Sequence, residues 1–203
     1  RKHIHAVLRK TPGHVAVFAP SYALLEQIVI EDEQWTGRKL LRERPRASKE
    51  EMDRMVDKLH QLRRSKDKAL LAGVLGGKLA EGVDYPENIL DAVICIGLPL
   101  PPPSARQDAL KDYYEDRFGS VRAWRYAGSQ PAVNRLMQAV GRPIRKAADR
   151  ALVVLLEKRL LQRGFKICMP EGMHAVETVD SERTERHAER FFERHPKPAK
   201  FTE

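Results

Sequence analysis

Apolar and polar positions follow two alternating patterns along the chain. Short apolar runs are typical of buried parallel strands. Such runs occupy residues 14–19, 68–75, 91–99 and 150–158, and a weaker one occupies 38–44. Segments of helical period follow them at 20–30, 48–64, 104–119 and 130–142, and a charged one ends the series at 181–195. Strands that alternate with helices predict an α/β fold with a parallel sheet and helices on both faces.

The helix that starts near residue 48 carries the clearest local signals. Ser48 and Glu51 have the spacing of a capping box, in which each side chain bonds to the backbone N–H of the other. Two further helix starts are indicated by Ser21, a suitable N-cap, and by Pro131, which is well placed in a first turn. Apolar residues recur at helical spacing at Met52, Met55, Val56, Leu59 and Leu62.

The chain shows no internal repeat and no long linker, so we expect one domain. Residues 1–180 are assigned to this domain, and residues 181–203 to a C-terminal helix and tail. The 181–195 helix has few apolar positions among its charges, which predicts light packing against the rest of the chain. The segment 196–203 is expected to fray.

The 203 residues include 42% hydrophobic ones, enough for a sizeable core, and they carry a net charge of +9. A basic surplus favours polyanionic partners, with nucleic acid ahead of an anionic membrane surface. A solvated basic surface without such a partner is the alternative. The most apolar stretch, 89–100, is too short to span a bilayer and contains Asp91, so we expect no membrane partner.

The two cysteines, Cys95 and Cys168, are far apart and form no metal-ligand spacing. We therefore expect no zinc, iron–sulfur or other metal site within this chain. Disulfide bonds are not expected either, which fits a reducing cytoplasm.

The segment GVLGGKLAEG, residues 73–82, begins like a phosphate-binding P-loop but does not meet its requirements. A P-loop has the spacing G-x-x-x-x-G-K-[ST] between a strand and a helix. Here the interval between glycines is one residue short, and Leu79 provides no hydroxyl for a magnesium ion. Gly82 and Pro86 also follow too soon for a helix whose N-terminus could bind phosphate. A free-standing P-loop NTPase is therefore disfavoured.

The same segment has features of a binding loop at the end of a strand. Gly76 and Gly77 permit a close approach of the backbone, and the carboxyl edge of a parallel sheet is where ligands bind. Lys78 adds a positive charge, and Glu81 and Asp84 place carboxylates on either side of a further glycine. A turn with charged ends is the alternative interpretation.

A second group of polar residues lies in the stretch QAVGRPIR. Gln138, Arg142 and Arg145 have the spacing i, i+4 and i+7, which places them within roughly 60° of one another on a helix. Two guanidinium groups and an amide on one side suit a bound phosphate. Pro143 cannot donate to the carbonyl of the preceding turn, so we expect the helix to kink or end near Gly141. A basic helix end facing solvent is the alternative.

Taken in order, three segments resemble the second motor domain of superfamily 2 helicases, specifically the XPD/DinG-like DNA helicases. VFAPSY (17–22) is similar to motif IV of that family, GGKLAEGVDYP (76–86) to motif V, and QAVGRPIR (138–145) to motif VI. The stretches DYYEDRFG and LEKRL also resemble connecting segments of the family, so the resemblance covers nearly the whole chain. It implies a RecA-like α/β domain, with a parallel sheet sandwiched between helices and a C-terminal helical tail.

In this family two RecA-like domains clamp ATP and Mg²⁺ between them. The resemblance implies that Arg142 and Arg145 act as arginine fingers on the γ-phosphate. It also implies that Gln138 contacts this phosphate or the attacking water. Four further residues of motifs V and VI are assigned to the nucleotide side of the domain, namely Glu81, Gly82, Asp84 and Gly141.

The resemblance also implies that single-stranded DNA crosses both motor domains. Residues at the carboxyl edge of the sheet would contact the DNA backbone, namely Ser21, Tyr22, Gly76, Gly77 and Lys78. Positive charge and backbone donors at such a surface give binding that is sensitive to salt and independent of sequence.

The chain departs from the family pattern in two places and lacks several family motifs. Pro143 stands where many relatives have a small residue, and Glu157 stands where an aspartate is frequent. Walker A, D-E-x-H and four-cysteine motifs, which lie in the first motor domain of the family, do not occur here. We therefore expect a fragment or subunit without its partner half and with negligible ATPase activity of its own. An iron–sulfur cluster, if the parent protein carries one, would lie outside this chain.

The expected function is that of the second motor domain of an ATP-dependent 5′–3′ DNA helicase, in the cytoplasm or, in a eukaryote, the nucleus. Its expected partners are single-stranded DNA, the first motor domain of the same protein, and repair or transcription factors. The motor half of an RNA helicase is one alternative, although motif VI there more often opens with His than with the Gln138 seen here. A non-catalytic nucleic-acid-binding module is another alternative, against which the retention of the motif VI arginines argues.

Overall fold

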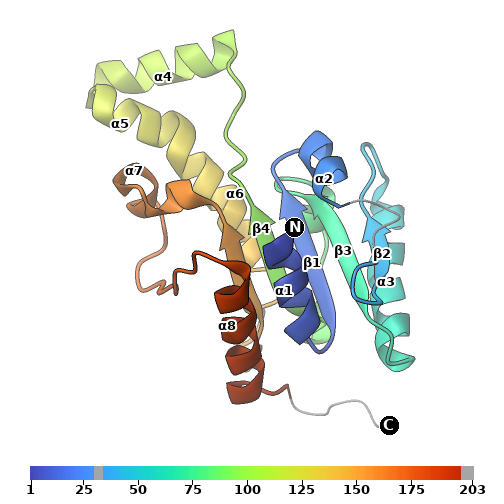
Figure 1. The fold of residues 1–203 in the computed structure, drawn as a ribbon. Coiled ribbons are helices and arrows are strands. Elements are labelled where there is room, and N and C mark those ends of the chain that lie inside the picture. Colours follow the sequence, from blue (N-terminus) through green and yellow to red (C-terminus); the bar gives the residue numbers. More distant parts are fainter. Residues whose placement is uncertain (30–33, 198–203) are drawn as a thin grey trace.

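The computed structural model describes residues 1–29 and 34–197. These residues form a five-stranded sheet, parallel throughout, in the order β2–β3–β1–β4–β5 (Figure 1). Each strand coincides with or overlaps an apolar run of the sequence, which confirms the predicted RecA-like α/β fold. The strands are β1 (His14–Ala19), β2 (Lys39–Arg42), β3 (Ala69–Val74), β4 (Leu90–Ile96) and β5 (Leu152–Leu156).

The inner strands account for the centre of the core. Every residue of β1 and β3 is buried, because these strands have neighbours on both sides and helices on both faces. In the register of the sheet, Val15 of β1 lies beside Leu70 of β3, and Val17 lies beside Ile94 of β4. The sheet therefore separates two apolar layers, one on each face.

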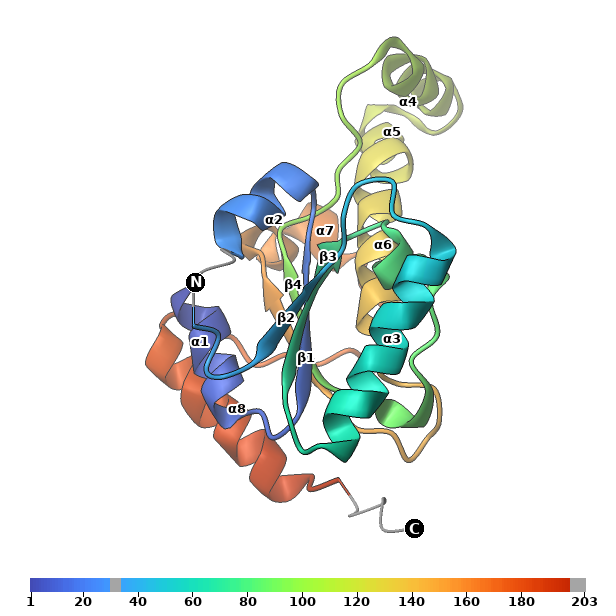
Figure 2. The same cartoon turned by 90° about the vertical axis from the view of Figure 1, so that its right-hand side faces the viewer.

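Helices cover both faces of the sheet, as predicted (Figures 1 and 2). The capping box predicted for α3 is present, since Ser48 Oγ accepts from Glu51 N at 3.2 Å and Glu51 Oε2 accepts from Ser48 N at 2.6 Å. One face is covered by α1 (Lys2–Lys10), α2 (Tyr22–Ile28) and α8 (Ser181–Arg194), and the other by α3 (Lys49–Arg64) and α6 (Gln130–Val140).

The sequence pattern does not predict α1, which is a short helix with basic residues at both ends. Ile4, Val7 and Leu8 nevertheless form one apolar face and are at most 1% exposed. Isolated helices of this length are unstable in water. Packing against the sheet, rather than the local sequence, therefore stabilises α1.

Helix α8 lies beside α1 and contacts it through charged side chains (Figure 1). Lys10 Nζ lies 2.7 Å from Glu189 Oε1, and Arg9 Nε donates to Glu185 Oε2 at 3.0 Å. Ion pairs at a surface contribute little, about 0–1 kcal/mol each, so they align the two helices more than they stabilise the fold. The division of the chain at residue 180 stays a prediction.

The fraying expected for the tail falls mostly on residues 198–203, which lie outside the described residues. Lys197 is fixed, because its ammonium donates to the carbonyl oxygens of Asn88 at 2.6 Å and Leu90 at 2.8 Å. The same nitrogen lies 3.3 Å from Asp91 Oδ1. Burial lowers the pKa of Lys197 to about 8, against the opposing effect of Asp91. The chain after α8 is thus tied to the start of β4.

A helical arm projects beyond the carboxyl edge of the sheet and leads into α6 (Figures 1 and 2). Its first helix, α4, buries none of its residues, all of which are described. Contacts within the arm hold it together: the Gln107 side-chain amide donates to Ala127 O at 2.7 Å, and the Phe118 and Tyr126 ring centroids are 5.2 Å apart. The arm consists of α4 (Ala105–Phe118), α5 (Ser120–Trp124) and a π turn over Arg125–Ser129.

The cysteines, the lengths of the helices and the remaining short elements complete the description of the fold. Cys95 on β4 and Cys168 after α7 are both free and buried, and burial raises the pKa of the Cys95 thiol to about 12. Across residues 1–29 and 34–197, no helix is both long and apolar enough to cross a membrane. The remaining short elements are turns at Lys78–Gly82, Pro86–Asn88 and Lys158–Leu161, and α7 (Arg163–Lys166).

Candidate nucleotide and nucleic-acid interface

Two predicted contact segments leave neighbouring strands at the carboxyl edge of the sheet. Ser21 and Tyr22 follow β1, and residues 76–78 follow β3. Because β1 and β3 are paired, the structure brings these predicted residues to one edge. Ser21 is the N-cap of α2, as predicted, and its Oγ accepts from Leu24 N at 3.3 Å.

The turn after β3 is a close approach of backbone segments. Gly77 N donates to Val74 O at 2.9 Å, and Gly76 has a φ of +81°, a conformation that favours glycine. A Cβ added to Gly77 would lie only 2.7 Å from Val74 Cγ2. The helical segment that follows is a single π turn of five residues, Lys78–Gly82, which is too short to act as the helix of a P-loop. The structure thus agrees with the prediction that no P-loop forms here.

Glu43, a buried carboxylate that contacts this turn, is not among the residues predicted from the sequence. Glu43 lies one residue beyond β2 and is 2% exposed. Its Oε2 accepts from Val74 N at 3.2 Å, and its Oε1 accepts from Lys78 N at 2.9 Å. Burial, followed by the charge of Glu43, raises the pKa of Tyr22 to about 12. The only signal for Glu43 in the sequence is a charged residue placed directly after a strand.

Two cations border the glycine turn. Lys78 is exposed, and its Nζ donates to Ala47 O, in the loop between β2 and α3, at 2.5 Å. Arg135 of α6 was not predicted, yet its Cδ lies 3.7 Å from the position that a Cβ on Gly76 would take. Arg135 precedes Gln138 by three residues, so both lie on the same side of α6. The turn therefore has positive charge from two separate elements.

Helix α6 ends before the arginines of motif VI. Its last residue is Val140 and its C-cap is Gly141, as expected from the position of Pro143, which is buried. The helical projection used in the sequence analysis therefore applies to Gln138 but not to the two arginines. Arg142 lies in the turn that follows the helix, and its N–H bonds to Ala139 O at 3.2 Å.

The two arginines nevertheless converge on motif V. Arg142 Nη1 donates to Val83 O at 3.0 Å, and its Nε donates to Gln138 O at 3.2 Å. Arg145 Nη2 lies 2.9 Å from Asp84 Oδ1, and these two side chains are 46% and 72% exposed. The structure thus brings motifs V and VI into direct contact at a solvent-accessible position.

The other predicted nucleotide-side residues lie around this contact. Glu81 and Gly82 are exposed in the π turn, Gly141 is exposed at the end of α6, and Gln138 is exposed on the last turn of that helix. Glu81 Oε1 lies 3.6 Å from the position of a Cβ on Gly76, which joins the nucleotide-side residues to the glycine turn. A ligand can therefore reach all of them from solvent.

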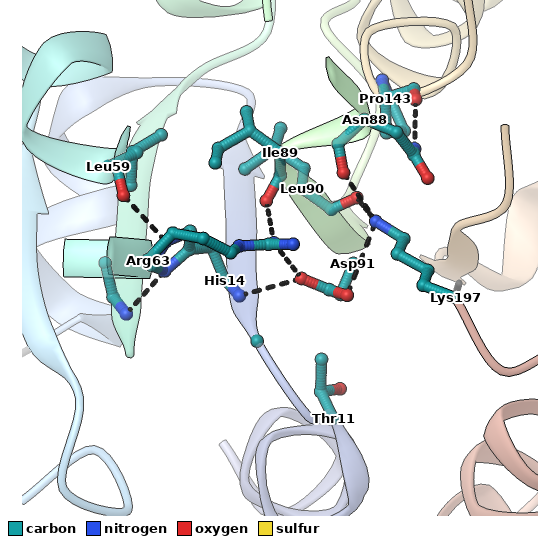
Figure 3. Close-up of polar contacts among 12 residues, drawn as sticks. Thr11, His14, Leu59, Arg63, Asn88, Ile89, Leu90, Asp91, Pro143 and Lys197 are labelled. Carbon is teal, nitrogen blue, oxygen red and sulfur yellow. Dashed lines mark hydrogen bonds and ion pairs between the residues drawn. The ribbon is translucent and has the colours of Figure 1, made fainter. Parts of the chain in front are cut away.

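The opposite, amino edge of the sheet holds a buried polar cluster (Figure 3). The Asp91 side chain is 3% exposed, and its Oδ2 accepts from Arg63 Nη2 at 2.5 Å and from His14 N at 3.0 Å. Lys197 approaches the other carboxylate oxygen from the opposite side. A Cβ added to Gly13 would lie 2.2 Å from Asp91 Oδ2, so only glycine fits there. This cluster anchors β1, α3, β4 and the C-terminal segment to one another.

The His14 imidazole of this cluster is neutral. Its Nε2 lies 2.9 Å from Leu59 O, and its Nδ1 lies 3.0 Å from Ala69 N. These partners require a hydrogen on Nε2 and a lone pair on Nδ1. Burial, followed by the positive charge of Arg63, lowers the pKa of His14 to about 4.

Asn88 connects the amino-edge cluster to motif VI. Its Nδ2 donates to Pro143 O at 2.6 Å (Figure 3). Its Oδ1 accepts from Arg150 N at 3.2 Å. Its backbone carbonyl accepts from Lys197. Since Pro143 stands between the two arginines in the sequence, Asn88 fixes the loop that carries both of them.

A RecA-like sheet whose glycine turn meets an arginine-bearing loop after α6 defines a motor domain of the helicase class. The chain belongs to the family of helicase C-terminal domains, which matches residues 4–176. This match covers motifs IV, V and VI and confirms the predicted second motor domain of an XPD/DinG-like superfamily 2 helicase.

Curated relatives agree with this assignment. The chain is 31% identical over 168 residues to the Fanconi anemia group J protein homolog of Gallus gallus, covering 76% of this chain and 13% of that protein. It is 31% identical over 169 residues to the regulator of telomere elongation helicase 1 homolog of Drosophila mojavensis, covering 75% of this chain and 16% of that protein. The chain therefore spans a small part of the length of these helicases.

Solved structures agree at the level of the fold. The structure named XPD_APO superposes with a TM-score of 0.60 at 24% identity, covering 82% of this chain and 34% of that one. The structure of S. tokodaii Xpd4 superposes with a TM-score of 0.53 at 18% identity, covering 84% of this chain and 33% of that one.

Proposed function

We propose that this domain is the second motor domain of an ATP-dependent 5′–3′ DNA helicase. It supplies arginine fingers to an ATP bound at the interface with a first motor domain, and it contacts single-stranded DNA at the carboxyl edge of its sheet. The observation that carries the proposal is the contact between motifs V and VI, in which Arg142 bonds to Val83 O and Arg145 pairs with Asp84.

The contact of Arg145 is weak enough for this side chain to exchange Asp84 for a phosphate during turnover. An exposed ion pair such as Arg145–Asp84 contributes only about 0–1 kcal/mol. A γ-phosphate carries more negative charge than one carboxylate and accepts bidentate bonds from a guanidinium, so it attracts Arg145 more strongly than Asp84 does. Movement of Arg145 toward the phosphate then releases Asp84 and alters motif V. Hydrolysis and the nucleic-acid contact are thereby coupled through one segment.

We propose that residues of both motor domains bind the ATP. Glu81, Gly82, Asp84 and Gly141 are exposed and would contact the nucleotide, and the exposed Gln138 would contact the phosphate or the attacking water. In the described part of the chain, no three His, Cys, Asp or Glu side chains gather into a metal site. The proposal assigns the ligands of Mg²⁺ to the first motor domain, by the resemblance to the family.

The nucleic-acid side of the proposal rests on the carboxyl edge of the sheet. Ser21 and Tyr22 open α2, and Lys78 and Arg135 border the glycine turn beside them. Cations and backbone N–H groups bind phosphates without regard to sequence. The motor half of an RNA helicase would use the same contacts, and unwinding assays on DNA and RNA duplexes distinguish the two. Repair or transcription factors are the partners proposed for the complete protein.

Replacing Arg142 with Ala in the complete helicase tests the finger assignment. ATP hydrolysis should fall about a hundredfold or more, because an arginine finger acts on charge that develops only in the transition state. The affinity for single-stranded DNA should change less than about threefold, since Arg142 does not border the glycine turn. Phosphate release and fluorescence anisotropy measure the two quantities. Arg106→Ala, on the exposed arm, is the matched control, and unchanged hydrolysis in Arg142→Ala overturns the assignment.

The 203-residue chain alone should show negligible ATPase activity with or without single-stranded DNA. The reason is that the proposal assigns the phosphate-binding loop and the magnesium ligands to the other motor domain. Phosphate release by the purified chain is the measurement. Robust DNA-stimulated turnover would contradict the proposed division of the ATP site.

A further inference from the structure

Glu43 is a buried charged residue that the proposed function does not use. Its backbone N–H continues the ladder of β2 by donating to Ala72 O at 2.8 Å. The main chain then leaves the sheet toward α3. The Glu43 side chain, in place of a further β2 residue, pairs with the end of β3. There the carboxylate accepts from the last N–H of β3, at Val74.

Groups from three segments converge on this carboxylate. Val74 N–H at the end of β3 and Lys78 N–H in motif V donate to it, and the Tyr22 hydroxyl in motif IV interacts with it. A carboxylate at 2% exposure is removed from water, and such a group is tolerated only where protein donors replace the lost hydration. Glu43 thus interacts with motif IV and motif V at once.

The position of the Glu43 carboxylate explains why residues 73 and 77 are glycines. A Cβ added to Gly73 would lie 2.7 Å from Glu43 Oε2, and one added to Gly77 would lie 2.8 Å from the same atom. Any side chain at either position would displace the carboxylate. The glycines that resemble a P-loop in the sequence therefore accommodate an internal carboxylate instead of a phosphate.

A second contact joins the loop after β2 to motif V. Lys78 donates its backbone N–H to Glu43 and its ammonium to Ala47 O, four residues further along the loop after β2. The position of Lys78 is therefore determined at both its backbone and its side chain. The Tyr22 hydroxyl interacts with the same carboxylate, so we expect a change at Glu43 to affect both candidate DNA contacts.

We infer that Glu43 is a positioning residue that holds Tyr22 and Lys78 in the arrangement that binds single-stranded DNA. This inference rests on the proposed function for the DNA contacts of those two residues. It adds that the affinity for DNA depends on a carboxylate that does not itself touch DNA.

The variant Glu43→Gln tests the inference in the complete helicase. Its amide keeps the size of the side chain, but the NH₂ group faces a backbone N–H and leaves one of the two backbone donors, Val74 N–H or Lys78 N–H, unpaired. In DNA-stimulated ATPase assays, the concentration of single-stranded DNA at half-saturation should rise about tenfold. The KM for ATP and the kcat at saturating DNA should stay within about twofold.

This combination of readouts separates positioning from stability. A purely structural role reduces the fraction of active enzyme, which lowers kcat and leaves the half-saturating DNA concentration unchanged. That result would overturn the inference. The control Glu26→Gln removes the same charge from an exposed position on α2 and should leave both parameters unchanged.

A double-mutant cycle with Tyr22→Phe tests the shared contact. Tyr22→Phe removes only the hydroxyl and should raise the half-saturating concentration about threefold. Combined with Glu43→Gln its effect should be less than additive, because both changes disturb the same interaction between residues 22 and 43. Strictly additive effects would overturn the coupling. If Glu43→Gln does not fold, Tyr22→Phe carries the test alone, and an unchanged half-saturating concentration overturns the inference.

Lys78→Ala distinguishes failure of the proposed DNA contact from failure of the positioning role of Glu43. If it leaves the half-saturating DNA concentration unchanged, the proposed DNA contact fails, and the inference fails with it. If Lys78→Ala raises that concentration and Glu43→Gln does not, the proposed contact stands and the inference alone is overturned.

Discussion

Two arginine–aspartate pairs in this domain have similar geometry and opposite surroundings. Arg63 Nη2 lies 2.5 Å from Asp91 Oδ2, with side chains 23% and 3% exposed. Arg145 Nη2 lies 2.9 Å from Asp84 Oδ1, with side chains 46% and 72% exposed. Breaking a buried pair costs about 3–5 kcal/mol, whereas an exposed pair contributes about 0–1 kcal/mol. The amino-edge pair therefore belongs to the fold, and the pair between motifs V and VI is free to exchange partners at low cost.

The largest expected effect comes from breaking the buried pair. Asp91→Ala should lower the free energy of unfolding by about 3–5 kcal/mol, because Arg63 and Lys197 would remain partly buried without a counter-charge. Urea titration of the 203-residue chain, followed by circular dichroism, measures the loss. Asp84→Ala is the matched control and should cost less than about 1 kcal/mol. Equal losses in the two variants would contradict the comparison.

Acid should weaken the buried cluster through His14. The pKa of His14 in the folded chain, about 4, is below its ordinary value of 6.5, so the unfolded chain binds a proton that the folded chain does not. The stability contributed by neutral His14 is fully present above about pH 6.5. As the pH falls to about 4, roughly 3 kcal/mol of it is lost. Urea midpoints across this range measure the loss.

The variant His14→Gln serves as the control for the acid effect. A glutamine amide can donate to Leu59 O and accept from Ala69 N, as the neutral imidazole does. Since glutamine does not titrate, the variant should lose less stability between pH 6.5 and 4 than the parent. An identical pH dependence in the two proteins would show that another group is responsible.

The smallest effect on stability is expected at the exposed pair. Arg145→Ala should change the free energy of unfolding by less than about 1 kcal/mol, while DNA-stimulated ATP hydrolysis by the complete helicase falls about tenfold or more. Urea titration and phosphate release measure the two quantities. Lys146→Ala removes a neighbouring exposed cation and should leave hydrolysis unchanged. A variant of Arg145 that lost stability and kept its turnover would reverse the roles of the two pairs.

Features with local signals could be predicted from the sequence. The inner strands are short apolar runs, and the capping box of Ser48 and Glu51 needs only residues three positions apart. The end of α6 was also predictable, because Pro143 has no backbone N–H to donate and its ring clashes with the preceding turn of a helix. Helix α1 could not be predicted, since its three apolar residues acquire their role only from the sheet beneath them.

The geometry of the site depends on long-range contacts and was correspondingly harder to predict. Glu43 and Val74 are 31 residues apart in the sequence, and Arg142 and Val83 are 59 apart. Motif similarity singled out Arg142 and Lys78 without indicating their hydrogen-bond partners in the fold. Glu43 and Arg135 have no distinctive sequence context, so only the folded chain reveals that both lie at the glycine turn.

The two buried cysteines provide the native chain with internal reporters of opening. A thiol reagent cannot reach either sulfur in the closed structure, so the modification rate measures how often the surrounding structure opens. Cys95 lies on the inner strand β4, in the apolar layer that α3 and α6 cover, and becomes accessible only when this central layer opens. Cys168 follows α7, a helix of four residues at the periphery, and becomes accessible when that part alone detaches. The ratio of the two rates therefore compares local with global unfolding without an engineered label.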